Sequence, residues 1–174
     1  MTRQEILANA VTESRDLLRR YLKGFDDTNH TKQASNLPNH VAWTLGHLAL
    51  ILNRVAEKLD GHPLPVDRFV KGDGSAGDRE RFDTESIAFN SKPIGEPSRY
   101  PAWPRCVQIF DAAIDRLANA LREATDQQLD SATRWGAGET TIGNLAMRMV
   151  FHNGTHAGQL ADLRRALNMG SIFA

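Results

Sequence analysis

Apolar residues recur at the spacing of one helix face in four separate stretches of the chain. The first stretch follows Thr2 and Glu5, which have the spacing of a capping box. Gly24 and the polar run 26–29 end it. Its apolar positions, spaced by threes, fours and sevens, are Leu7, Val11, Leu18, Leu22 and Phe25. The pattern predicts a helix that begins at about Thr2 and buries a single stripe.

A second helix is predicted to begin near Pro38 and to end at Gly61. Proline suits the first turn of a helix, because the N–H that it lacks would be unpaired there. Glycine followed shortly by a proline, here Pro63, is typical of a helix end. Between these limits, apolar residues alternate at steps of four and three: Val41, Leu45, Leu48, Leu52, Val55 and Leu59. The spacing predicts a core-facing helix.

The periodic pattern stops between Asp60 and Trp103, where glycine and proline are frequent. A connection this long in a compact domain is usually functional or mobile. We interpret it as a long crossover rather than a second domain, with one short helical turn from Asp83 to Phe89.

Two further helices follow the crossover. Pro104 opens the third, whose apolar stripe comprises Val107, Phe110, Ile114, Leu117 and Leu121. After a polar loop with Gly136 and Gly138, Thr140 or Thr141 caps the last helix, which runs to about Leu167. The sequence therefore predicts an all-α fold: a four-helix bundle with a long crossover between helices 2 and 3, in a single domain over 1–174.

The composition narrows the functional classes. The 174 residues hold 21 lysines and arginines against 21 aspartates and glutamates. A net charge of zero argues against a nucleic-acid partner, which requires a basic surplus. The single cysteine, Cys106, suits a reducing compartment. No signal-peptide pattern opens the sequence, and no apolar run reaches the ~18 residues of a membrane span. We therefore expect a cytoplasmic protein without a membrane partner.

The last helix places two histidines where its period calls for apolar residues. Its stripe reads Ile142, Leu145, Met149, His152, His156, Leu160, Leu163 and Leu167. His152 and His156 are four residues apart, so they lie on one face and can share a metal ion. From this pair alone, hydrogen bonds to carbonyl or carboxylate groups of other helices are an equal alternative. Asn153 replaces the glutamate of the H-E-x-x-H motif, which excludes that class of metalloprotease.

A third histidine, His47, favours the metal. It lies beside the apolar stripe of the second helix, next to Gly46, which allows a neighbouring helix or a ligand to approach. Three neutral imidazoles from two helices suit Zn(II) or Ni(II) and leave a coordination position open. His40 is expected to act near the helix start, and His30 and His62 are expected in solvated loops.

Further residues are weaker candidates. Trp43, one turn before the first histidine of the triad, is expected in the core, with a cavity wall as the alternative. Asn144 and Gln159 can line the pocket or hydrogen-bond a metal ligand, or lie on the helix surface. Cys106 has no cysteine–histidine arrangement to support a nucleophile. The pair 164–165 (Arg-Arg) is expected on solvated helix surface, with an acidic co-substrate or partner as the alternative.

The sequence also resembles the DinB/YfiT-like superfamily of metal-binding four-helix bundles. The resemblance rests on the segments 39–48 (Asn-His-Val-Ala-Trp-Thr-Leu-Gly-His-Leu) and 152–160 (His-Asn-Gly-Thr-His-Ala-Gly-Gln-Leu), with Arg99-Tyr100-Pro101 and Leu163-Arg164-Arg165 as further matches. The family's metal ligands are its first histidine and its H-x-x-x-H pair, which match His47, His152 and His156. Many members carry an aromatic residue where this chain has Thr155.

The resemblance implies an up-up-down-down bundle, frequent homodimers and, in a few relatives, low-molecular-weight thiols as co-substrates. Those relatives are S-transferases or maleylpyruvate isomerases, and many others have no assigned reaction. Our first hypothesis is therefore a metal-dependent enzyme, a thiol S-transferase or a hydrolase, acting on a small molecule. The second is a non-catalytic metal-binding stress or interaction protein. A metal-free structural bundle ranks last.

Overall fold

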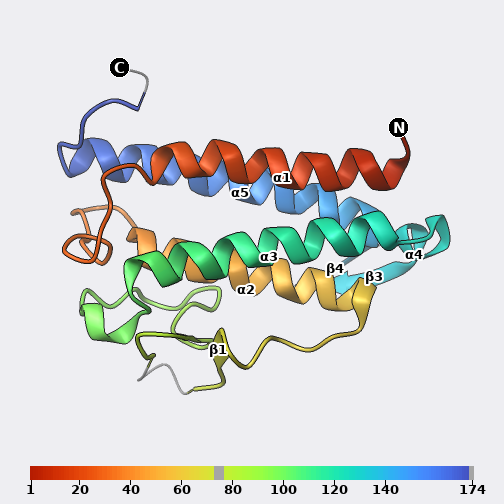
Figure 1. Cartoon of the computed structure of the whole chain (residues 1–174), viewed down its shortest axis with the longest axis horizontal. Coiled ribbons are helices and arrows are strands. Elements are labelled where there is room, and N and C mark those ends of the chain that lie inside the picture. The colour runs from red at the N-terminus through yellow and green to blue at the C-terminus, as the bar shows by residue number, and fades with distance from the viewer. Residues whose placement is uncertain (73–76, 173–174) are drawn as a thin grey trace.

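The computed structural model describes residues 1–72 and 77–172, and these are mostly helical (Figure 1). Four long helices form most of the structure: α1 (Arg3–Tyr21), α2 (Val41–Asp60), α3 (Trp103–Glu123) and α5 (Ile142–Ala166). A short helix α4 (Asp126–Asp130), a 3-10 turn η1 (Pro97–Arg99) and two small two-stranded sheets complete it. The predicted helical character is confirmed, whereas the sheets were not predicted.

The four long helices form two parallel pairs that run in opposite directions. Helix α1 packs against α3 and α5, and α2 also packs against α3 and α5. Arg164 near the end of α5 donates to the carbonyl of Tyr21 at the end of α1, so α1 and α5 are parallel (Figure 1). Arg116 late in α3 binds Asn53 and Asp60 late in α2, so α2 and α3 are parallel as well.

This order of directions corrects the up-up-down-down order that the family resemblance implied. Helices α1 and α2 run in opposite directions, because the segment 22–40 turns the chain back at the end of α1 (Figure 1). Helices α2 and α3 run in the same direction, because the segment 61–102 is long enough to return to the starting end.

The helix ends follow local capping rules, with one correction. The capping box of Thr2 and Glu5 is present at the start of α1, and the left-handed Gly61 ends α2. Helix α2 begins at Val41, so Pro38 lies outside it. The first turn is instead capped by His40, whose Nδ1 accepts the backbone N–H of Trp43 at 3.1 Å. The expectation that His40 acts at the helix start is confirmed.

The crossover between α2 and α3 packs against α2. Its strands β1 (Phe69–Val70) and β2 (Phe82–Asp83) pair in parallel. No helix forms from Asp83 to Phe89, where one helical turn was expected: Asp83 ends β2, and turns with one bend follow it. The Asp83 carboxylate accepts the backbone N–H groups of Glu85 and Ser86, which stabilises the turn without a helix. Because the crossover covers α2, every residue from 41 to 50 is buried, not just one stripe.

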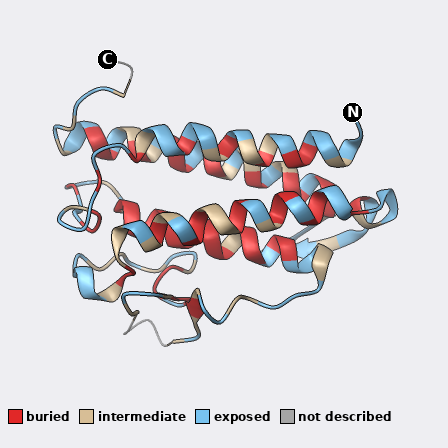
Figure 2. Cartoon of the chain, viewed as in Figure 1, coloured by how far each residue is buried: buried red, intermediate tan, exposed pale blue. Residues whose placement is uncertain are grey.

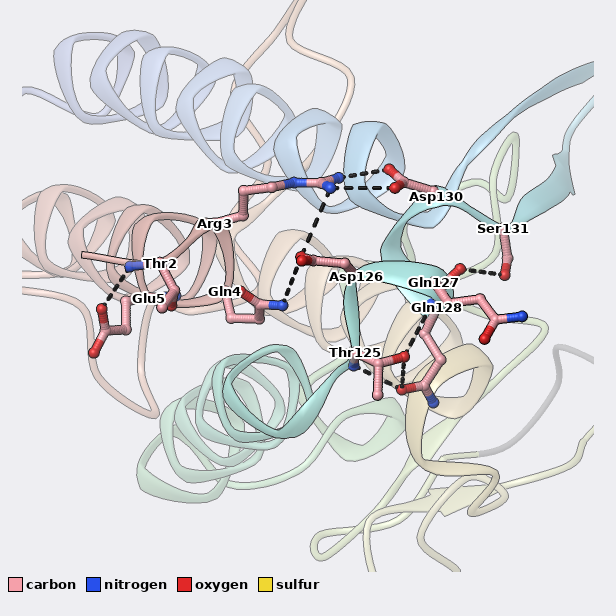
Figure 3. A network of polar contacts seen from close by, with 10 residues as sticks. All are labelled: Thr2, Arg3, Gln4, Glu5, Thr125, Asp126, Gln127, Gln128, Asp130 and Ser131. Carbon is pink, nitrogen blue, oxygen red and sulfur yellow. Dashed lines mark hydrogen bonds and ion pairs between the residues drawn. The ribbon is translucent and has the colours of Figure 1, made fainter.

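The segment expected to be a polar loop before α5 contains α4 and a β-hairpin. Strands β3 (Ala132–Trp135) and β4 (Gly138–Thr141) are antiparallel, with Gly136 in a left-handed conformation at the turn. Thr141 then caps α5, as one of the two predicted threonines. Figure 3 shows how the start of α1 is tied to this end: Arg3 binds Asp130, and the amide of Gln4 donates to Asp126.

Buried residues lie on the facing sides of the long helices and continue into the crossover (Figure 2). The largest fully buried side chains come from α1, α2, α3 and the crossover, among them Leu18, Leu45, Phe82, Tyr100 and Phe110. Within residues 1–72 and 77–172, no helix combines the length and the apolar character that crossing a membrane requires.

Candidate metal centre

Three histidines meet between α2 and α5. His47 comes from α2, and His152 and His156 come from α5. Their ring centroids are 5.3 Å (His47–His152), 5.5 Å (His47–His156) and 4.7 Å (His152–His156) apart. One ring nitrogen from each lies within 4.8 Å of the other two. The structure therefore brings together the three residues that the sequence pattern singled out.

The spacing within the α5 pair matches two ligands of one ion. The Nε2 atoms of His152 and His156 are 3.2 Å apart. Two nitrogen ligands at about 2.05 Å from a tetrahedral zinc ion are separated by about 3.3 Å. The His47 nitrogen, within 4.8 Å of both, needs a shift of at most about 1.5 Å to reach the same spacing. The donor set thus fits a divalent cation.

The crossover fixes the orientation of His47. Its Nδ1 lies 2.8 Å from the carbonyl oxygen of Ile87. A carbonyl only accepts, so Nδ1 carries the hydrogen and the lone pair of Nε2 is left for a metal. Gly46 makes this contact possible: a Cβ there would come within 2.7 Å of the Phe82 ring and 2.9 Å of the Ile87 side chain. The close approach expected at Gly46 therefore comes from the crossover, and not from a helix or ligand.

Trp43 lies in the core, as expected, and it also contacts the candidate ligand His47. Its ring stacks on His47 with centroids 4.7 Å apart and an interplanar angle of 9°, and it is buried in the core. Its indole N–H donates to the Ser91 hydroxyl at 2.8 Å, and that hydroxyl donates to the Ser86 carbonyl. The indole is thus a wall of the site that the crossover holds in place.

Burial keeps all three imidazoles neutral at pH 7. It lowers the pKa of His47, with a smaller contribution from the charge of Arg54. Burial, followed by the charges of His47 and Arg148, lowers the pKa of His152 to about 4. Burial, followed by His152 and His47, lowers the pKa of His156 to about 3. Neutral imidazole is the form that binds metals, so no proton has to leave the site near neutral pH.

The two remaining pocket candidates are placed differently. The Gln159 side chain lies next to His156 and opposes the lowering of its pKa. Gln159 Oε1 and His156 Nδ1 are both buried, and within the described residues neither makes a hydrogen bond of normal geometry. They are a matching acceptor and donor for a histidine that binds metal through Nε2. Asn144 is exposed in the first turn of α5, about 12 Å along the helix axis from His152.

Burial corrects the expectations for His30 and Arg164, which were both predicted to be solvated. His30 is fully buried and not solvated, and neither ring nitrogen has a partner in the described part of the chain. Arg164 is only 6% exposed and donates to the carbonyls of Tyr21, Lys23 and Gly170. It thus closes the end of α1 and is not solvated helix surface. Arg165 and His62 are exposed, as expected.

Cys106 is not a nucleophile in this fold. It is fully buried, its thiol donates to the Pro101 carbonyl at 3.2 Å, and burial raises its pKa far above the ordinary value. A thiolate, the reactive form, is therefore disfavoured at this position.

The sequence did not identify the groups that hold His47 in place. The Ile87 carbonyl belongs to the main chain, which leaves no side-chain signature. Ser91 is one of many polar residues in a segment without a periodic pattern. Gly46 was the only signal, since a glycine beside a candidate ligand marks a close contact without identifying its partner.

The comparisons with known proteins agree with this fold. A crystal structure described as that of a conserved protein of locus from Enterococcus faecalis has a similar fold, with a TM-score of 0.73 and 15% sequence identity. The match covers 95% of this chain and 97% of that one. No curated protein matches the chain. The DinB superfamily profile matches residues 10–160, a range that includes all three histidines. The chain therefore belongs to the DinB superfamily.

Proposed function

We propose that this chain is a metal-dependent enzyme in which His47, His152 and His156 hold one divalent cation, zinc or nickel. The observation that carries the proposal is the approach of three neutral, largely buried imidazoles to within 4.8 Å of one another. Among the described residues, no cysteine or carboxylate joins this group. Three protein ligands are typical of catalytic zinc sites, whereas structural sites usually have four.

The ligand set favours thiol chemistry over hydrolysis. A divalent metal supplies Lewis acidity, which lowers the pKa of a thiol or a water molecule toward neutrality. A free thiol begins near pKa 8.5 and water near 15.7, so a thiol needs much less activation. Among the described residues, no aspartate or glutamate joins the group of three histidines, where it would act as a general base for water. A low-molecular-weight thiol S-transferase is therefore our first candidate, and a metal-dependent hydrolase our second.

A non-catalytic metal-binding stress or interaction protein is the alternative function. His47 is only 4% and His156 only 6% exposed, which is typical of a metal that serves the fold. The half-buried His152 is the ligand that favours access from outside. If the metal is structural, its removal should unfold the chain.

Three finer expectations belong to the same proposal. We class the four long helices as a four-helix bundle with one long crossover and as a single domain. We also propose a homodimer, as the family resemblance implies, and a cytoplasmic location. Light scattering coupled to size-exclusion chromatography tests the dimer, and a monomeric mass would contradict it.

Elemental analysis of untagged protein tests the metal. We expect about one zinc or nickel ion per chain in the wild type and none in His47→Ala. The matched control is His62→Ala, which removes an exposed histidine outside the cluster and should keep the metal. Wild-type protein that stays metal-free after incubation with zinc and nickel would refute the proposal.

Cobalt substitution then separates the enzyme from the alternative. A small thiol that enters the open coordination position should change the visible spectrum of the cobalt protein. An unchanged spectrum at saturating thiol would count against the S-transferase. Unfolding of the metal-free protein, followed by circular dichroism, would support the structural alternative.

A further inference from the structure

The arginines around the triad are exceptional within this chain. Most arginines donate to a carboxylate, amide or carbonyl oxygen, as Arg3, Arg15 and Arg116 do. Within residues 1–72 and 77–172, four have no such partner: Arg20, Arg54, Arg134 and Arg148. All but Arg20 belong to α2, α5 or the hairpin that leads into α5. Three of the four unpartnered arginines are therefore carried by neighbouring elements at the hairpin end of the molecule.

The helix directions place these three arginines on one side of the triad. Arg54 follows His47 by seven residues, about 10 Å along α2, and Arg148 precedes His152 by four residues, about 6 Å along α5. Because α2 and α5 are antiparallel, both displacements point toward the end of the molecule that carries the hairpin (Figure 1). Arg54 acts electrostatically on His47, and Arg148 acts on His152. Both arginines therefore lie on the side of the triad that faces the hairpin, one on each helix that carries a histidine of the triad.

A groove continues from Arg54 toward the hairpin. It has a volume of about 510 Å³ and is lined by Arg54, Glu57, Lys58, Arg134, Trp135 and Gly136. The lining supplies three cations, one carboxylate and an indole. Glu139 lies opposite Arg134 in the hairpin register, yet neither it nor Glu57 forms an ion pair with an arginine of the groove in the described residues. The groove therefore has a positive surplus beside an aromatic surface, and its volume suits a small organic molecule.

We propose that the co-substrate of the triad is a small organic anion whose carboxylate is bound by Arg54 and Arg148, with Arg134 and Trp135 lining its outer part. This inference rests on the proposed function, since it assigns the substrate class of the same site. A guanidinium group binds a carboxylate through two parallel N–H···O bonds, which fixes orientation as well as affinity. A positive opening also raises the rate at which anions arrive.

Binding of succinate to zinc-loaded protein tests the proposal. Isothermal titration at low ionic strength, where exposed charges are least screened, should detect succinate and not its neutral diamide, succinamide. The double variant Arg54→Gln/Arg148→Gln should bind succinate at least tenfold more weakly, because both partners of the carboxylate are gone. The matched control is Arg20→Gln, which removes the other unpartnered arginine, on α1, and should stay within twofold of the wild type.

Three results would overturn the assignment: equal succinate affinity in the double variant, equal binding of succinamide, or tighter binding of inorganic phosphate than of succinate. The zinc content of every sample separates this inference from the proposed function. If the double variant keeps its zinc and binds succinate as tightly as the wild type does, the assignment of the two arginines is refuted and the proposed function is not. If the wild type holds no zinc but still binds succinate at least tenfold more tightly than the double variant does, the proposed function is refuted and the role of the two arginines is not.

Discussion

Replacing Gly46 with alanine tests how the crossover positions His47. A Cβ at this position would lie 2.7 Å from two ring carbons of Phe82 and 2.9 Å from Cγ2 of Ile87. Carbon atoms do not approach this closely in a packed interior, so the crossover must move away from α2. Overpacking of this kind costs about 1–3 kcal/mol. Alanine recovers about 1 kcal/mol over glycine in a helix interior. We expect a net loss of about 1 kcal/mol of stability.

The same substitution should weaken metal binding. Moving Ile87 also moves the carbonyl that accepts the hydrogen bond from His47 Nδ1. Loss of a hydrogen-bond partner behind a metal ligand typically lowers metal affinity by about 10- to 100-fold. We therefore expect Gly46→Ala to bind zinc at least about tenfold more weakly than the wild type does.

Two measurements and one control test the effects of Gly46→Ala on stability and on zinc binding. Urea unfolding of metal-free protein gives the stability, and competition with a chelator gives the zinc affinity. Gly158→Ala is the matched control, since that glycine is exposed on α5 and no atom lies within 4 Å of an added Cβ. It should gain up to about 1 kcal/mol and keep its zinc affinity. Wild-type zinc affinity in a destabilised Gly46→Ala would refute the positioning role, and unchanged stability would refute the packing argument.

Three other predictions follow from buried polar groups. Burial lowers the pKa of His40 to about 4, below its unfolded value of 6.5. Its contribution to stability is therefore complete above pH 6.5 and is lost as the pH falls toward 4, about 3 kcal/mol in all. Urea unfolding at about pH 7 and about pH 4.5 should show this loss, and His40→Asn, which keeps a helix-capping side chain, should reduce it. Arg116→Ala should cost about 3 kcal/mol, because it leaves the partly buried Asp60 and Asn53 without their partner. Arg20→Ala, without such contacts, should stay within about 0.5 kcal/mol of the wild type in the same assay. Cys106 should resist iodoacetamide in the folded protein and react in urea, as read by mass spectrometry, and fast labelling of the native chain would contradict its burial.

The long helices could be predicted because their signals are local. Apolar residues at helical spacing mark the buried stripe, and caps such as Thr2, Gly61 and Thr141 depend on the backbone groups next to them. The start of α2 was misplaced for a related reason. Pro38 is compatible with a first helical turn, but the nearby Asn36 adopts a left-handed conformation and His40 provides the cap.

The small sheets and several buried polar residues could not be predicted from local signals. Strands β1 and β2 pair over only two residues each, which is too short for an alternating pattern. The hairpin 132–141 is largely exposed and carries no apolar alternation that would separate it from a loop. His30 and Arg164 are polar residue types. His30 is buried where the segment 22–40 meets α3, and Arg164 where α5 meets the end of α1.

The three-histidine cluster could be predicted for the opposite reason: the polarity of these residues conflicts with their positions. Imidazoles on the apolar stripe of α5 require partners, and the spacing of His152 and His156 allows one ion to serve both. Their supporting groups had no such signal, because a main-chain carbonyl such as that of Ile87 can come from any residue.

The crossover covers the side of the site formed by α2. It packs on α2 through Phe82 and Ile87, and it holds the rear of His47 and the indole of Trp43. Helices α1 and α3 have no ligand in the triad, and α3 covers α2 on another side. The half-buried His152 lies on the seam between α2 and α5, where the outer face of α5 is exposed. In the proposed binding mode, the co-substrate is held by Arg54 and Arg148 and the metal by the three histidines. Because the two proposals depend on different side chains, different variants can test them separately.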